Sequence, residues 1–89
     1  MNEDGAFHIR VRLSEAFREG VGEFLSITTP VKSLGEVIGQ LEEKVPRFSE
    51  AYDDGYVFAV NGQLVLWAVS ATVVQNGDEI EIMLALAGG

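Results

Sequence analysis

The 89-residue sequence contains no cysteine, two prolines and one histidine. Without cysteine, a disulfide framework, a thiol nucleophile and a thiolate metal site are all excluded. No apolar run approaches the roughly 20 residues that cross a bilayer. The amino end, MNEDGAF, lacks the charged-then-apolar layout of a signal peptide. We therefore expect a cytoplasmic protein with no membrane partner.

Basic side chains are also scarce: 6 Lys and Arg stand against 14 Asp and Glu, which gives a net charge of −8. An acidic surface repels phosphate backbones, so nucleic acid is disfavoured as a partner and a protein with a basic docking surface is favoured. The hydrophobic fraction of 47% is that of a globular chain. We expect one domain over residues 1–89, with a flexible tail at about 85–89.

The chain is poor in catalytic groups. It has no serine in a Gly-x-Ser-x-Gly context and no glycine-rich phosphate loop. Its one histidine, His8, falls on the outward side of an alternating stretch, as a solvated histidine does. Asp53–Asp54–Gly55 supplies too few oxygens for calcium, whose loops spread their ligands over about 12 residues. We expect no intrinsic enzyme activity, and no metal or cofactor bound by this chain.

Alternation of apolar and polar residues predicts the strands. The first covers FHIRVRL (7–13), the second EFLSIT (23–28), and the last EIEIMLAL (79–86), in which Ile80, Ile82, Leu84 and Leu86 share a face. YVFAVNGQLVL (56–66) predicts two strands around Asn61–Gly62, a dipeptide typical of tight hairpin turns. The first and last strands alternate most cleanly, so they should lie at the centre of the sheet.

One long helix is predicted over residues 33–45, SLGEVIGQLEEKV. Ser33 and Glu36 form a capping box, and Pro46 follows the end. Five apolar residues share one face of this helix: Leu34, Val37, Ile38, Leu41 and Val45. Gly35 and Gly39 suggest a close approach to a sheet. SEAFREGVG (14–22), with Ser14 as N-cap, predicts a short helix or turn, and RFSEAYDDG (47–55) a polar turn.

A single amphipathic helix has one apolar stripe to bury, so it should cross one face of a mixed sheet of four to five strands and leave the other face open. The expected fold class is α+β. The chain then finishes with ALAGG, directly after the last strand. A terminal carboxylate can attack the α-phosphate of ATP and become an acyl adenylate. Gly88 and Gly89 have no Cβ and would pass into a narrow active site of another protein; a frayed end is the alternative.

The chain resembles the ubiquitin-like β-grasp sulfur carriers, and specifically the MoaD family, the small subunit of molybdopterin synthase. The resemblance rests on FREGVG (17–22), FAVNG (58–62), NGDEIEI (76–82) and AGG (87–89). It implies that an adenylating enzyme uses ATP to activate the Gly89 carboxylate and that a sulfur donor converts it to a thiocarboxylate. The synthase large subunit would then grip the tail, Ala87 and Gly88 included, while sulfur passes to a pterin precursor.

The resemblance also assigns docking residues: Leu64 and Met83 on the open sheet face, and Arg18 in partner contacts. From the residues alone, Leu64 and Met83 could equally be core or scattered surface residues, and Arg18 could pair with an acid such as Glu15. The segment between Asn61–Gly62 and Asn76–Gly77 is longer than in the family, which allows a partner-specific loop. Trp67, which this segment holds, is interpreted as core or subunit-interface packing in preference to a ligand stack. MLAL also stands where the family usually carries prolines.

Other readings keep the same activation chemistry. A carrier for thiamin, cysteine or tRNA thiolation would differ only in the acceptor, and a ubiquitin-like modifier would be conjugated to lysines. An interaction module with an inert tail is the alternative from a different class. The residues do not separate a molybdenum from a tungsten cofactor.

Overall fold

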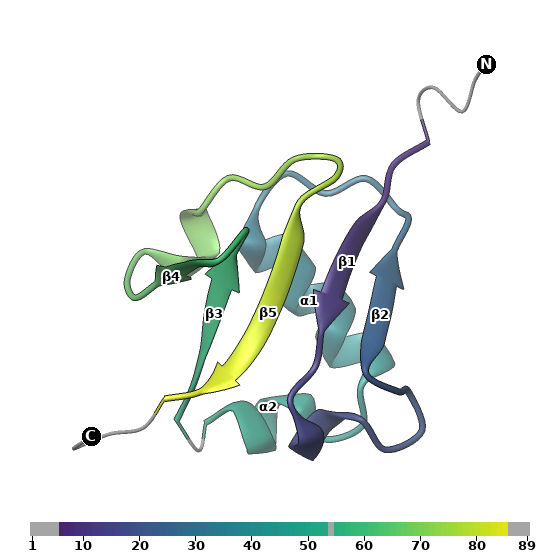
Figure 1. The fold of residues 1–89 in the computed structure, drawn as a ribbon, viewed down its shortest axis with the longest axis vertical. Coiled ribbons are helices and arrows are strands. Elements are labelled where there is room, and N and C mark those ends of the chain that lie inside the picture. The colour runs from purple at the N-terminus through teal and green to yellow at the C-terminus, as the bar shows by residue number, and fades with distance from the viewer. Residues whose placement is uncertain (1–5, 54, 86–89) are drawn as a thin grey trace.

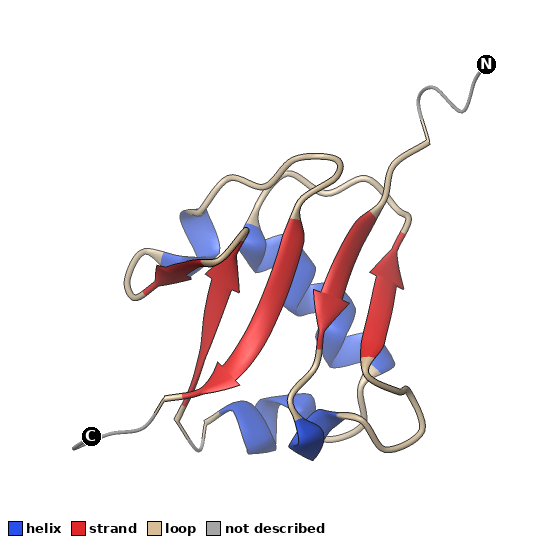
Figure 2. Cartoon of the chain, in the orientation of Figure 1, coloured by secondary structure: helices blue, strands red, loops and turns tan. Residues whose placement is uncertain are grey.

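The computed structural model describes residues 6–53 and 55–85, and five strands of this part form one mixed sheet in the order β2-β1-β5-β3-β4 (Figure 1). The strands are β1 Ile9–Arg12, β2 Phe24–Ile27, β3 Tyr56–Val60, β4 Gln63–Val65 and β5 Glu79–Leu84. The long helix α1, Leu34–Lys44, crosses one face of the sheet (Figure 2). This is the α+β arrangement predicted from the sequence.

The last strand lies at the centre of the sheet, as predicted. β5 is parallel to β1, with Val11 opposite Ile80, and antiparallel to β3, with Phe58 opposite Ile82. β1 in turn pairs antiparallel with β2. The two strands with the cleanest alternation are therefore neighbours, although 69 positions separate Val11 from Ile80 (80 − 11).

The core lies between the sheet and α1. Alternate residues of the central strands are buried, including Ile9, Val11, Ile80 and Ile82, and they meet the apolar stripe of α1, of which Leu34, Val37 and Leu41 are fully buried. Leu84 continues the inward face of β5 but is 52% exposed, because it lies at the end of the strand. Leu86, predicted on the same face, lies outside the described residues.

The capping box at the start of α1 is only half as predicted. The Ser33 hydroxyl accepts a hydrogen bond from the Glu36 N–H at 3.2 Å, but the Glu36 carboxylate accepts from the N–H of Lys32, at 2.7 Å, one residue before the expected donor. The extended backbone of residues 32–34 is held by hydrogen bonds with residues 72–74, which fixes this approach to the helix.

The close approach expected at Gly35 is made to a different element. A Cβ at Gly35 would lie 3.0 Å from the carbonyl oxygen of Ser70, in the short 3-10 helix η2, Val69–Ala71. A Cβ at Gly39 would meet nothing within 4 Å. The prediction of contact with the sheet is therefore wrong. Gly35 allows η2 to approach the helix closely, and no element packs closely against Gly39.

Two short helices close one end of the fold. Residues 14–22 contain a single 3-10 turn, η1 Glu15–Phe17, and the Ser14 hydroxyl donates to the carbonyl of Ile82 instead of capping it. Residues 47–55, predicted as a polar turn, include a helix, α2 Phe48–Tyr52. Phe48 is buried and its ring lies 5.1 Å from that of Phe17. None of the described helices is long and apolar enough to cross a membrane.

Candidate functional site

The base of the proposed tail lies at the end of β5. Leu84 is paired with Tyr56, and one residue further the N–H of Ala85 donates to the carbonyl of Gly55 at 2.8 Å. Figure 1 shows this end of β5 beside the turn that precedes β3. Ala87, Gly88 and Gly89 lie outside the described residues. The structure therefore describes the chain as far as Ala85, where the predicted tail begins.

The two predicted docking residues lie on the open face of the sheet. Met83 of β5 is opposite Val57 of β3, and Leu64 of β4 is opposite Ala59, so alternation places these four side chains on the side away from α1. Met83 is half-buried, and Leu64 is 50% exposed. The interpretation of either residue as core is therefore wrong, whereas their role in docking stays a prediction.

The other half of the open face carries charges that neutralise one another. The Arg10 guanidinium lies 2.8 Å from the Glu79 carboxylate and 4.4 Å above the ring of Phe24. The Arg12 guanidinium lies 3.1 Å from the carboxylate of Glu23 and 4.0 Å from that of Glu81. These pairs are solvent-exposed, so each adds little stability. Arg10 and Arg12 are therefore ion-pair partners of neighbouring acids.

Arg18 has a local structural contact. Its Nε donates a hydrogen bond of 2.8 Å to the carbonyl of Leu13, which ties the η1 turn to the end of the β1 segment. Within residues 6–53 and 55–85 no carboxylate lies within ion-pair distance of Arg18, so the expected pair with Glu15 is wrong. The partner contact implied by the family stays a prediction. His8 is exposed, with Nε2 3.0 Å from the Ser26 hydroxyl.

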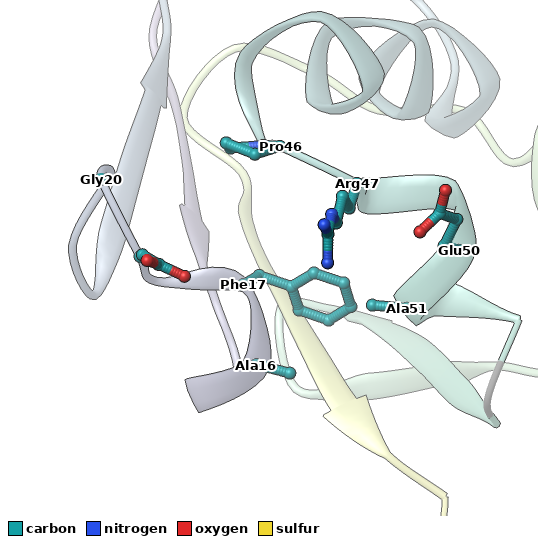
Figure 3. Close-up of a pocket in the computed structure, with 8 residues that line it drawn as sticks. Ala16, Phe17, Gly20, Pro46, Arg47, Glu50 and Ala51 are labelled. Carbon is teal, nitrogen blue, oxygen red and sulfur yellow. The ribbon is translucent and has the colours of Figure 1, made fainter.

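A pocket between η1 and the start of α2 was not predicted. Figure 3 shows the Arg47 side chain pointing toward the ring of Phe17, with Pro46 and Ala51 at either side. Arg47 adopts a left-handed backbone conformation, φ 59°, at the start of α2. The apolar spacing of Phe48, Ala51 and Tyr52 was the available sequence signal for this helix. The pocket is lined by the Arg47 guanidinium, the carboxylates of Glu19 and Glu50, and apolar side chains.

The surroundings of Tyr52 change its ionisation. Burial, with the neighbouring charge of Asp53, raises the pKa of Tyr52 above its usual value. The Tyr52 ring stacks on Phe48 at 5.5 Å and lies 5.4 Å from Phe58, which explains the burial. Residues 6–53 and 55–85 bring together no group of three His, Asp or Glu side chains that could hold a metal ion.

A mixed sheet in this strand order, with one long helix across one face, defines a ubiquitin-like β-grasp protein. The profile of the ThiS family matches residues 11–89, and the chain belongs to this family. The superfamily predicted from the sequence is thereby confirmed, and with it the coarser class of ubiquitin-like sulfur carrier.

Solved structures share the fold at low identity. The chain is similar to the HVO 2177 protein of Haloferax volcanii, with 20% identity, a TM-score of 0.74, and coverage of 100% of this chain and 92% of that one. Subunits 1 and 2 of the molybdopterin-converting factor of Helicobacter pylori were solved as a complex. That match has 23% identity, a TM-score of 0.67, and coverage of 92% and 99%.

A third similar structure is the small archaeal modifier protein 1 of Methanosarcina acetivorans, with 19% identity, a TM-score of 0.69, and coverage of 94% and 98%. No curated protein matches the sequence significantly. Identities this low show the fold alone. The structural similarity covers at least 92% of this chain and at least 92% of each of the three relatives.

Proposed function

We propose that this protein is the sulfur-carrying small subunit of a molybdopterin synthase, with the Gly89 carboxylate as its reacting group. A carboxylate oxygen attacks the α-phosphate of ATP in an adenylating enzyme, and pyrophosphate leaves. Hydrosulfide delivered by a sulfur donor then attacks the acyl carbon of the adenylate, AMP leaves, and a thiocarboxylate remains. ATP and the sulfur donor belong to the partner enzymes, so this chain needs no bound cofactor.

The observation that carries the proposal is the anchoring of Ala85. Its hydrogen bond to Gly55 fixes the chain at the end of the central strand, just before the four residues that finish in Gly88 and Gly89. Four extended residues reach at most about 14 Å. This is long enough to enter a cleft while the folded body docks outside it. The family profile also runs through to Gly89.

In this proposal the partner enzymes supply the catalytic groups and this chain supplies only the reacting carboxylate, which agrees with the chemistry of the described side chains. Arg10 and Arg12 are engaged with carboxylates, and His8 is exposed beside a serine. Leu64 and Met83 supply an apolar part of the open face on which a larger subunit would dock. The Helicobacter pylori relative was solved in complex with its subunit 2, which supports a large-subunit partner here.

A protein modifier is the second candidate. The modifier of Methanosarcina acetivorans matches 94% of this chain with a TM-score of 0.69. A modifier and a carrier share the adenylation step and differ in the final acceptor, a lysine amine or a sulfur acceptor. Carriers for thiamin, cysteine or tRNA thiolation differ from the first proposal in the acceptor alone.

Intact-mass measurement of the protein from its native cells tests the activation step. A carrier shows a species in which one oxygen is replaced by sulfur at Gly89, whereas a modifier shows higher-mass conjugates. Deletion of Gly89 should abolish activation by the adenylating enzyme and leave the unfolding transition unchanged, because no core residue is lost. Gly39→Ala, a substitution with open space around it, is the matched control and should keep activation.

Activation that survives the loss of Gly89 would contradict the proposal, and so would unfolding of the shortened chain. The acceptor is tested separately, by purifying the partner that binds the activated carrier. A large subunit that forms the pterin dithiolene supports the molybdopterin assignment, and any other sulfur acceptor replaces it.

A further inference from the structure

One segment of this acidic chain is free of charge. Residues 55–77 contain no Asp, Glu, Lys, Arg or His, although charged residues make up 22% of the sequence. The segment forms β3, β4, η2 and the loops between them, at one edge of the sheet (Figure 1). A net charge of −8 is therefore carried entirely by the rest of the molecule.

Apolar side chains are exposed at this edge. Four of them form what we call the β4 patch: Leu64 at 50% exposure, Leu66 at 71%, Trp67 at 85% and Val73 at 70%. The core position considered for Trp67 is therefore wrong. Leu64, Leu66 and Trp67 fall within four positions of the chain, and Val73 lines a hollow together with Leu64. Exposed apolar patches mark interaction sites in soluble proteins.

The loop that carries Trp67 is ordered by its own hydrogen bonds. Ala68 adopts φ 54°, its carbonyl accepts from the N–H of Ala71 at 3.1 Å, and the Thr72 hydroxyl donates to the same carbonyl at 3.2 Å. The indole is consequently presented on a structured turn, and little conformational entropy would be lost when it is covered.

β4 is also an edge strand with a free backbone side. In a hairpin with the two-residue turn Asn61–Gly62, the pairs Val60–Gln63 and Phe58–Val65 exchange hydrogen bonds, so the N–H and C=O of Leu64 point away from β3. Edge strands are usually protected by proline, lysine or another charge. β4 carries none of these.

We propose that the β4 patch is a homodimer interface, in which β4 pairs antiparallel with β4 of a second copy. Placing Leu64 on the two-fold axis lets each Leu64 N–H donate to the other Leu64 carbonyl and brings Leu66, Trp67 and Val73 against the partner. In a two-fold contact, residues close to the axis meet their own copies, so a charge at that place would meet its like. The β4 patch avoids that repulsion, whereas the surface that bears the charge of −8 does not.

The proposal goes beyond the carrier role and does not depend on activation of Gly89; because Leu64 belongs to both surfaces, the dimer and the proposed complex with the large subunit would compete for it. Sedimentation of the full chain from about 1 µM to about 1 mM should show the mass rising from that of the 9.7 kDa monomer toward twice that value, with Kd in the micromolar range expected of a small interface. Trp67 is the only tryptophan, so its fluorescence emission should move to shorter wavelength over the same concentrations.

Two variants locate the interface. Trp67→Ser removes the largest apolar group, and Leu64→Lys places two like charges on the axis; each should raise the dimer Kd at least tenfold, and added salt should partly restore Leu64→Lys. Phe24→Ser, at an exposed aromatic on the opposite edge strand, is the control and should dimerise normally. The mutated side chains are at least 41% exposed, so thermal unfolding should show each variant folded.

A protein that stays monomeric at every concentration would overturn the proposal and leave the β4 patch to a different partner. Association without a shift of Trp67 emission, or association weakened equally by Phe24→Ser, would place the contact elsewhere and also overturn it.

Discussion

The backbone N–H of Ala85 donates a 2.8 Å hydrogen bond to the carbonyl oxygen of Gly55. The bond extends the pairing of β3 with β5 by one step beyond Tyr56 and Leu84. It joins the segment from which the proposed reactive tail departs to a turn whose glycine has φ 105°. The position at which the tail begins thus depends on a backbone conformation that glycine alone adopts readily.

Gly55→Ala tests this dependence. A Cβ at Gly55 would meet nothing within 4 Å, so the penalty comes from the backbone angle and not from a clash. We expect the free energy of unfolding to fall by about 1–2 kcal/mol and the Ala85 amide to exchange its hydrogen faster. Denaturant titration and amide exchange measure the two effects. Unchanged protection of Ala85 would show that the turn does not hold the tail base.

Gly35 and Gly39 should respond to alanine with opposite signs. Both lie in α1, where alanine is favoured over glycine by about 1 kcal/mol. Gly39→Ala should gain that stability because the space around it is open, whereas Gly35→Ala brings a Cβ within 3.0 Å of the Ser70 carbonyl and should be destabilising. Paired denaturation curves measure the difference. Equal gains at both sites would mean that η2 moves away without penalty.

Met83→Lys should weaken partner docking more than folding. Met83 is half-buried on the open face, so we expect the free energy of unfolding to fall by less than about 1 kcal/mol and the Kd for the partner to rise more than fivefold, the effect of losing an apolar interface contact. Calorimetric titration with the purified partner and denaturation measure the two quantities. Gln63→Lys adds the same charge on the α1 side of the sheet, away from the open face, and is the control. A large loss of stability in Met83→Lys would assign the residue to packing.

Tyr52→Phe should reduce the loss of stability at alkaline pH. Burial and Asp53 raise the pKa of Tyr52, so the folded protein keeps the phenol proton at pH values where the unfolded chain loses it. The unfolded state then binds fewer protons above about pH 10, and stability falls as pH rises through the folded pKa. Denaturation at a series of pH values should give a shallower decline for Tyr52→Phe. An identical slope would show that Tyr52 does not titrate differently in the two states.

The strands and the long helix could be predicted because each buries one face, and the sequence therefore alternates with the period of the element. Asn61–Gly62 also predicted its turn, and the structure gives these residues φ angles of 50° and 85°. α2 was missed because its five residues contain little more than one turn, so Phe48 and Tyr52 gave only a short apolar signal in a polar stretch.

Long-range contacts were less accessible from the sequence. The position of Gly35 against Ser70 and the bond between Ser14 and Ile82 join residues far apart in the chain, which no local period reports. The family resemblance placed Leu64 and Met83 on the open face, but the residues alone left a core position open until the register with β3 was known. For the predicted site itself, Gly88 and Gly89 came from their position after the last strand and from the family resemblance.

The pairing of β1 with β5 has a consequence for biosynthesis. The strand that completes the middle of the sheet follows the four other described strands in the chain, and it lies beside the first. A nascent chain that has not yet delivered Glu79–Leu84 from the ribosome cannot close its interior, because the partner of β1 is still missing. Chains that end before Glu79 should therefore stay unfolded and open to proteolysis, so that folding depends on synthesis of the strand that leads to the glycines.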